Sequence, residues 1–250
     1  MNDNEHLSHT ERPGHTEHDS HPDHGSSPEE YWEGEYSGSP ARWSGNVNGT
    51  MAEVVSELPT VSGRSALDLG CGEGGDAVWL ASQGWQVTAV DISATATARG
   101  AELARTAGVS EAITWVTHDL ATWETTEAFD LVTASFFHST VELPREQILR
   151  RAAEQIRPGG HLLLVTHVFE GPDDIPEWSL RFHGTDDPND PELQKHFSVL
   201  KTPSEEVAAL DLDDADWTLE KQEIRLREAT GPDGVETATV KDGVILLRRS

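Results

Sequence analysis

The chain has 250 residues, of which 36% are hydrophobic and 25% are charged, enough for one domain with a substantial core. Its 45 acidic residues outnumber 18 basic ones and give a formal net charge of -27, which disfavours nucleic acid and anionic membranes as partners. The single cysteine excludes an intrachain disulfide, and no apolar run is long enough to cross a bilayer. We therefore expect a cytoplasmic protein, whose oligomeric state the sequence leaves open.

The first residues differ in composition from the rest. Residues 1–28 are rich in His, Asp, Glu, Ser and Pro, which predicts a disordered tail. Four of the histidines recur at every third position: His15, His18, His21 and His24. Imidazoles so spaced favour weak, exchangeable binding of zinc, copper or nickel, and a solvated tail without a specific role is the alternative. A folded domain is predicted over residues 29–250, where no Cys/His cluster indicates a metal site.

Short apolar strands and helices alternate along the domain. After a helix over 48–57, strands are predicted over 66–69, 86–90, 112–117, 129–134 and 161–168, with helices over 75–83, 93–107 and 145–156. A helix over 204–210 and two adjacent strands, 217–227 and 237–248, complete the predicted elements. The pattern predicts an α/β fold, a Rossmann-like three-layer sandwich whose mostly parallel sheet ends in an antiparallel hairpin.

The turn after the first strand contains LGCGEGGD, and its glycines satisfy two patterns. Gly70, Gly72 and Gly75 form G-x-G-x-x-G, typical of dinucleotide-binding enzymes, whereas Gly70, Gly72 and Gly74 form G-x-G-x-G, typical of S-adenosylmethionine-binding proteins. Both use glycine for a tight turn that lets a ligand approach the backbone. Cys71 is interpreted as a small residue that fills the loop, because no neighbouring base would activate its thiol.

Carboxylates at the strand ends favour one cofactor over the other. Asp91 ends the second strand, where it suits the ribose of either cofactor. Asp119, after the third strand, suits the exocyclic amine of adenine. Asp68, two residues before Gly70, suits the ammonium of an amino-acid cofactor and would repel a pyrophosphate. Each acid alone also fits a solvated strand end, but the three in this order favour S-adenosylmethionine.

Here the chain resembles the class I S-adenosylmethionine-dependent methyltransferases. The matching stretches are ALDLGCGEGG, VTAVDIS, THDL, FDLVTASFFH and IRPGGHLLLV, and the resemblance covers roughly residues 40–250. It implies a seven-stranded sheet and S-adenosylmethionine as cofactor. The implied cofactor-binding residues are Trp43, Asp68, Gly70, Cys71, Gly72, Gly74, Asp91, Ile92, Asp119, Leu120 and Ser135.

The resemblance also implies roles for these residues. Asp68 and the glycines would meet the methionine part, Asp91 the ribose, Ile92 the adenine face, and Asp119 with Leu120 the adenine edge. Within the class, the chain is similar to small-molecule methyltransferases of the tellurite-resistance and thiopurine type. Their N-terminal segment folds over the cofactor, and residues 42–44, which include Trp43, occupy the equivalent place.

Acceptor residues are expected after the fourth and fifth strands. Phe136 and Phe137 are expected to form a wall of the substrate pocket. His138 could accept a proton or orient the substrate, and His167 is the second catalytic candidate. The alternative for each histidine is a packing role. Residues 170–202 are predicted to form an inserted loop on the acceptor side. Within this loop, Arg181 and His183 could bind an anionic substrate. The alternative is an ordinary exposed loop without a binding role.

Taken together, these features predict methyl transfer to a small molecule. A thiol, selenol or metalloid anion needs alignment and little else, whereas a hydroxyl or amine also needs a general base. O- or N-methylation of a small metabolite stays open as an alternative. A non-catalytic cofactor-binding or metal-buffering protein is the alternative from another class.

Overall fold

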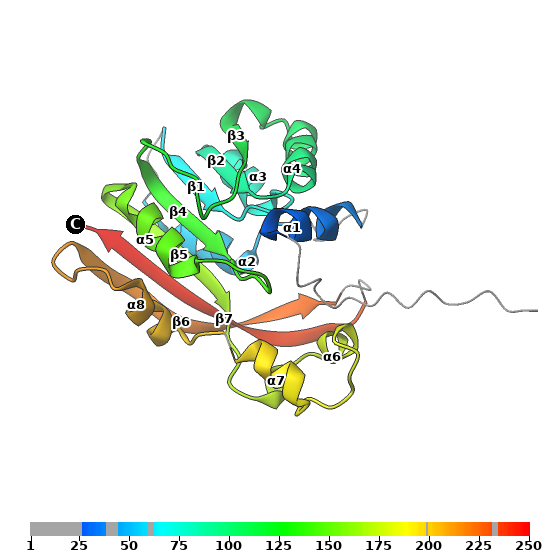
Figure 1. The fold of residues 1–250 in the computed structure, drawn as a ribbon. Helices are drawn as coiled ribbons and strands as arrows, with labels where there is room; N and C mark the ends of the chain where they lie inside the picture. The colour runs from blue at the N-terminus through cyan, green and yellow to red at the C-terminus, as the bar shows by residue number, and fades with distance from the viewer. Residues whose placement is uncertain (1–26, 39–44, 60–62, 199, 232–234) are drawn as a thin grey trace, which may run out of the picture.

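The computed structural model describes residues 27–38, 45–59, 63–198, 200–231 and 235–250. Its centre is a seven-stranded sheet with the order β3-β2-β1-β4-β5-β7-β6 (Figure 1). Strands β1 to β5 run parallel, and β7 runs antiparallel to both β5 and β6. The predicted fold class, including the closing hairpin, is confirmed.

The elements have the following bounds. The strands are β1 (Ser65–Leu69), β2 (Gln86–Asp91), β3 (Ile113–Thr117), β4 (Phe129–Ser135), β5 (Ile156–His167), β6 (Trp217–Thr230) and β7 (Thr237–Arg249). The α-helices are α1 (Pro28–Ser37), α2 (Gly49–Glu57), α3 (Gly75–Ser82), α4 (Ala94–Ala107), α5 (Arg145–Glu154), α6 (Glu177–Phe182), α7 (Pro191–Phe197) and α8 (Pro203–Leu210). Short 3₁₀ turns are η1 (Ser110–Ala112) and η2 (Pro172–Asp174). The sequence did not predict α1, α6 or α7.

Helices cover both faces of the sheet. Met51 of α2 and Leu80 of α3 pack with alternate strand residues in one apolar cluster. Leu149 of α5 and Leu210 of α8 pack with the intervening strand residues in a second cluster. Each such fully buried side chain contributes about 1.5–3 kcal/mol to folding. The two clusters make the molecule a three-layer sandwich.

Two segments differ from their prediction. Residues 157–160, which lie between the predicted helix 145–156 and the predicted strand 161–168, belong to β5. They form an irregularity in its pairing with β4, between the Phe129–Ile156 and Leu131–His161 pairs. The segment 170–202, predicted as a loop, contains η2, α6 and α7. These elements lie along the part of the β6–β7 hairpin that projects from the sheet (Figure 1). In the described ranges, no helix has the length and apolar character needed to span a membrane.

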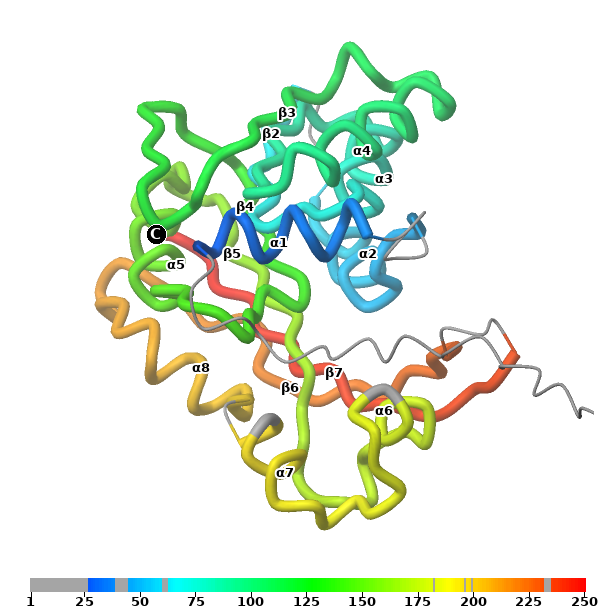
Figure 2. Tube along the Cα trace, turned by 45° about the vertical axis from the view of Figure 1, so that its right-hand side comes forward, coloured from blue at the N-terminus to red at the C-terminus, as the bar shows by residue number. Residues whose placement is uncertain are grey.

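Helix α1 lies across the carboxyl ends of the strands. In Figure 2 it passes in front of β4 and β5, with α4 near one end and the loop after β4 near the other. This edge includes the place where the strand order reverses, between β1 and its neighbours β2 and β4. Open α/β sheets bind their ligands at such a place.

Candidate active site

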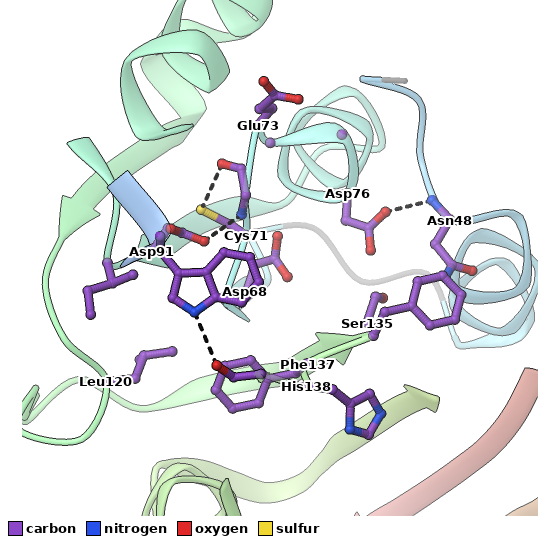
Figure 3. A pocket seen from close by; sticks show the side chains of 18 of the residues that line it. Asn48, Asp68, Cys71, Glu73, Asp76, Asp91, Leu120, Ser135, Phe137 and His138 are labelled. Atoms are coloured by element: carbon purple, nitrogen blue, oxygen red, sulfur yellow. Dashed lines mark hydrogen bonds between the residues drawn. The ribbon is translucent and has the colours of Figure 1, made fainter. Parts of the chain in front are cut away.

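A cavity of about 440 Å³ opens at this edge of the sheet, within the size range of small-molecule sites (Figure 3). The turn after β1 and the ends of β2 and β3 line one half, which we call the cofactor half. The loop after β4, the end of β5 and β6 line the other, which we call the acceptor half. Figure 3 shows Asp68 and Asp91 in the first half and Phe137 and His138 in the second.

The glycine turn is shaped by backbone conformation. Gly70, Gly72 and Gly74 have φ of 65°, 51° and 84°, values that side chains other than glycine rarely adopt. A Cβ at Gly74 would also lie 2.4 Å from the Trp115 ring. Gly75 is needed for a different reason, because its Cβ would lie 2.3 Å from the Asn46 carbonyl oxygen. The left-handed residues therefore coincide with the G-x-G-x-G pattern.

Asp68 places an unsatisfied carboxylate oxygen on the cavity wall. Its side chain is buried, and Oδ1 accepts a hydrogen bond of 3.1 Å from Thr133 Oγ1. Its Oδ2 is buried without a hydrogen-bond partner in the described part of the chain. Burial, reinforced by the Asp76 carboxyl, raises the pKa of Asp68 well above its usual range. Such an oxygen suits a cationic donor in the cavity.

Asp91 joins the glycine turn to the start of α4. Its two oxygens accept hydrogen bonds of 2.9 Å from the backbone N–H groups of Gly72 and Ser93. Burial raises the pKa of the Asp91 carboxyl. At the end of β3, Asp119 accepts a hydrogen bond of 2.8 Å from the Ala121 N–H. Both acids line the cavity.

The other cofactor residues implied by the resemblance lie along the same wall. Those that line the cavity besides the acids and glycines above are Cys71, Ile92, Leu120 and Ser135. Burial raises the pKa of the Cys71 thiol well above its usual range, so this thiol stays protonated. Trp43 lies outside the described residues.

The loop after β4 begins with a strained turn. Phe136 has φ of 50°, a left-handed conformation that is unfavourable for an aromatic residue. The His138 N–H donates to the Phe136 carbonyl oxygen at 2.8 Å and closes the turn. Phe137 packs so close to Gly70 that a Cβ there would lie 2.7 Å from its ring. The turn at Phe136 thus packs the acceptor half against the glycine turn of the cofactor half.

Both histidines predicted as catalytic residues line the acceptor half. Burial lowers the pKa of His138 to about 3, with a further contribution from Arg145, and its Nε2 is buried with no partner in the described ranges. His167 stacks on Phe136, with ring centroids 3.9 Å apart and planes at 6°. Desolvation by the surrounding wall lowers the pKa of His167 to about 4, although the residue is exposed and lines the cavity. Both imidazoles are neutral at pH 7 and are weak bases.

Helix α1 covers the cavity and is held from both sides. Its Glu33 carboxylate accepts hydrogen bonds from Ser93 Oγ at 2.6 Å and from the Thr95 N–H at 3.1 Å. Trp32 Nε1 donates to Ser139 Oγ, in the loop after β4, at 3.2 Å. The helix therefore ties the first turn of α4 to the acceptor half.

The start of α1 carries a local sequence signal. Ser27 and Glu30 form a capping box, in which each side chain accepts a hydrogen bond from the other residue's N–H. Pro28 occupies the first helical position. The motif S-P-x-E at the start of a helix is a recognised signature. The helix has a weakly apolar face, so periodicity alone did not reveal it.

Two predicted substrate-binding residues of the inserted segment lie away from the cavity. Arg181 and His183 do not line the described cavity. The Arg181 side chain is 58% exposed and pairs with Glu177 and Glu236, while His183 packs edge-to-face on Phe197. The reason is the course of α6, which packs on the projecting hairpin, with Trp178 against Gly231, and not on the cavity.

Arg227 of β6 lines the acceptor half, and sequence analysis did not single it out. It belongs to no motif, and only strand pairing brings it to the cavity. In the ranges that the structure describes, no group of three or more His, Cys, Asp or Glu residues is arranged to hold a metal ion. The histidines of the predicted tail, at positions 15, 18, 21 and 24, lie outside those ranges.

Comparison with known proteins identifies the fold family. Residues 66–160 match a family model described as a methyltransferase domain. This part of the chain is therefore a methyltransferase domain. A similar solved structure concerns the conversion of a disulfide bond into a thioacetal group during echinomycin biosynthesis. It is 26% identical, with a TM-score of 0.63, over 88% of this chain and 92% of that one.

Curated methyltransferases are similar over part of their length. A probable thiol methyltransferase 2 from Arabidopsis thaliana is 31% identical over 53% of this chain and 59% of its own length. Thiocyanate methyltransferase 1 from the same plant is 30% identical over 56% of this chain and 60% of its own length. Ribosomal RNA small subunit methyltransferase C from Chromohalobacter salexigens is 29% identical over 50% of this chain and 39% of its own length. The chain thus spans less than two thirds of the length of each of these relatives.

Proposed function

We propose that this methyltransferase transfers a methyl group from S-adenosylmethionine to the sulfur of a small thiol. When bound, the cofactor supplies an electrophilic methyl group carried on a sulfonium. The thiolate sulfur forms the new bond to carbon, the old carbon–sulfur bond breaks, and its electron pair stays on the departing sulfide. The protein has to hold the two sulfur atoms in line with the methyl group and keep water away.

The cofactor half fits S-adenosylmethionine chemically. The unpaired Oδ2 of Asp68 suits its ammonium, and the left-handed glycines leave room beside the backbone for the methionine part. Asp91 would bind the ribose hydroxyls, Ile92 would pack on the adenine face, and Asp119 with Leu120 would contact the adenine edge. The buried acids also favour a cofactor that carries positive charge.

The observation that carries the choice of a thiol is the state of the two histidines. A general base works best when its pKa lies near the operating pH, and the pKa values of His138 and His167, about 3 and 4, lie far below it. They are therefore poorly suited to deprotonate a hydroxyl. A thiol ionises by itself near pH 8.5 and needs no strong base. Selenols share this chemistry.

Two of the relatives support a sulfur acceptor by name, the probable thiol and the thiocyanate methyltransferases. The relative named for ribosomal RNA favours a different acceptor. A net charge of -27 opposes binding of an RNA backbone, and α1 covers the cavity where a base would have to enter. A small acceptor agrees better with both features.

The test is methyl transfer to three acceptors of the same shape, thiophenol, phenol and aniline, with labelled S-adenosylmethionine. We expect product from thiophenol alone, with a rate that rises with the thiolate fraction up to the pKa of the thiol. Equal transfer to phenol or aniline would contradict the choice of sulfur. Binding of S-adenosylhomocysteine without turnover on a broad thiol panel would contradict the proposed activity.

A further inference from the structure

The charges that line the cavity are unevenly distributed. The described acidic lining residues are Asp68, Glu73, Asp76, Asp91, Asp119 and Glu142. All but Glu142, which is exposed in the loop after β4, belong to the cofactor half. Arg227 is the one cationic side chain among the described lining residues, and it lies in the acceptor half. The cavity therefore pairs acidic groups at one end with a fixed cation at the other.

The Arg227 guanidinium is held in place by a buried carboxylate. Arg227 Nε and Nη2 donate to Asp242 Oδ2 and Oδ1 at 2.8 Å and 3.3 Å. Asp242 is fully buried, and Thr50 Oγ1 donates to its Oδ2 at 2.7 Å. A two-point pair of this kind fixes both the position and the plane of the guanidinium. Nη1 takes no part in these two hydrogen bonds, so it can donate to a ligand in the cavity.

The sheet order places Arg227 on the side of the cavity remote from the cofactor half. Strand β6 lies three places beyond β4 in the sheet order, and adjacent strands are about 4.8 Å apart. Arg227 Cζ lies 5.7 Å from the centroid of Phe136, the ring that stacks on His167. Arg227 thus enters the acceptor half from the side opposite to β2 and β3, beyond the Phe136–His167 stack.

We propose that Arg227 binds an anionic group of the acceptor, at the end remote from the sulfur that receives the methyl group. This inference rests on the proposed thiol methylation and names the class of thiol: one that carries a carboxylate or a similar oxyanion. The stacked rings hold the apolar middle of such a molecule, and the guanidinium holds its anionic end. In the alternative, Arg227 serves only to neutralise Asp242.

The test compares para-mercaptobenzoate with its neutral amide, which differ in charge and little in shape. We expect the wild-type protein to prefer the carboxylate. Arg227→Met should raise KM for the carboxylate about tenfold or more, as for loss of a charged hydrogen bond, and leave KM for the amide and both kcat values nearly unchanged. Equal changes for the two acceptors, or no wild-type preference, would overturn the anion site.

Two further variants make the test independent of folding. Arg227→Met leaves Asp242 buried without its partner, so the double variant Arg227→Met/Asp242→Asn is measured beside it, with thermal unfolding of both. Arg225→Met is the matched control, since Arg225 lies on the same strand and pairs with Glu53 and Glu223 at the surface. It should leave both KM values unchanged.

A binding experiment separates this inference from the proposed activity. Benzoate is titrated into the protein saturated with S-adenosylhomocysteine, where no chemistry takes place. Binding that is lost in both Arg227 variants and kept in Arg225→Met would support the anion site, even if neither thiol is methylated and the proposed activity fails. Benzoate binding that is the same in all variants, or absent from wild type, would overturn it.

Discussion

The cofactor half and the acceptor half of the cavity are built in different ways. The cofactor half comes mainly from short stretches that follow strands β1, β2 and β3, and much of it is backbone held by Gly70, Gly74 and Asp91. The acceptor half is made of side chains far apart in the chain, from Phe136 to Arg227. The first half tolerates few substitutions because its backbone is constrained. The second can change its specificity one side chain at a time.

The largest expected effect is in the cofactor half, at Gly74. Gly74→Ala combines a left-handed φ of 84° with a Cβ 2.4 Å from the Trp115 ring. We expect the free energy of unfolding to fall by about 3 kcal/mol, from backbone strain plus overpacking, and binding of S-adenosylhomocysteine to be lost. Urea unfolding and calorimetry measure the two effects.

The matched control is Gly84→Ala, at a residue with φ of 86° and no atom within 4 Å of the added Cβ. It should cost only the backbone part, about 1 kcal/mol, and leave binding intact. Equal losses of unfolding free energy in the two variants would show that the Trp115 side chain moves aside at little cost. The glycine turn would then be less constrained than its geometry indicates.

The next effect concerns Asp91. Asp91→Ala removes the acceptor for the Gly72 and Ser93 N–H groups, and with it the carboxylate that we propose binds the ribose. The dissociation constant of S-adenosylhomocysteine should rise about 10- to 100-fold, as expected for the loss of charged hydrogen bonds. Asp91→Asn keeps one acceptor oxygen and should lose less. An unchanged affinity in a folded Asp91→Ala protein would remove Asp91 from the cofactor site.

In the acceptor half, the pH dependence of stability reports on His138. Its pKa of about 3 in the folded protein lies below the value of about 6.5 in an unfolded chain. As the pH falls below 6.5, the unfolded chain takes up the proton first, so folding loses stability. Because His138 is only half-buried, we expect about 1 kcal/mol between pH 6.5 and 5, less than the full linkage value.

His138→Gln should remove this pH-dependent loss, measured by urea unfolding at pH 7 and pH 5. Phe137→Leu alters the neighbouring residue without removing a titrating group, so its cost should be the same at both pH values. If the two variants respond alike to pH, the imidazole is better solvated than its buried Nε2 indicates.

The smallest expected effect tests how the two halves are linked. Glu33→Ala removes the hydrogen bonds from Ser93 and Thr95 that hold α1 over the cavity. S-adenosylhomocysteine should dissociate about fivefold faster, as expected for about 1 kcal/mol, when followed by stopped-flow fluorescence. Glu29→Ala, at an exposed residue of the same helix, should leave the rate unchanged. Faster release in both variants would indicate a loss of helix and not of the Glu33 contacts.

The sequence by itself determined the alternating strands and helices of the parallel part of the sheet, and the set of residues in the cofactor half. Periodicity and caps such as Ser93 located β1 to β5 and α2 to α5, because these signals are local and act within one turn or strand. The glycine turn and Asp91 lie close to each other along the chain, so their spacing alone predicted a shared site.

Only the tertiary structure decided the acceptor half. Strand pairing brings Arg227 to the cavity, and the packing of α6 on the β6–β7 hairpin places Arg181 away from it. Neither outcome has a local signal. Helix α1 closes the site through contacts of Trp32 and Glu33 with residues at least 60 positions away. Side chains brought together by long-range packing leave no pattern in the sequence, because the contact depends on the whole sheet order and not on neighbours in the chain.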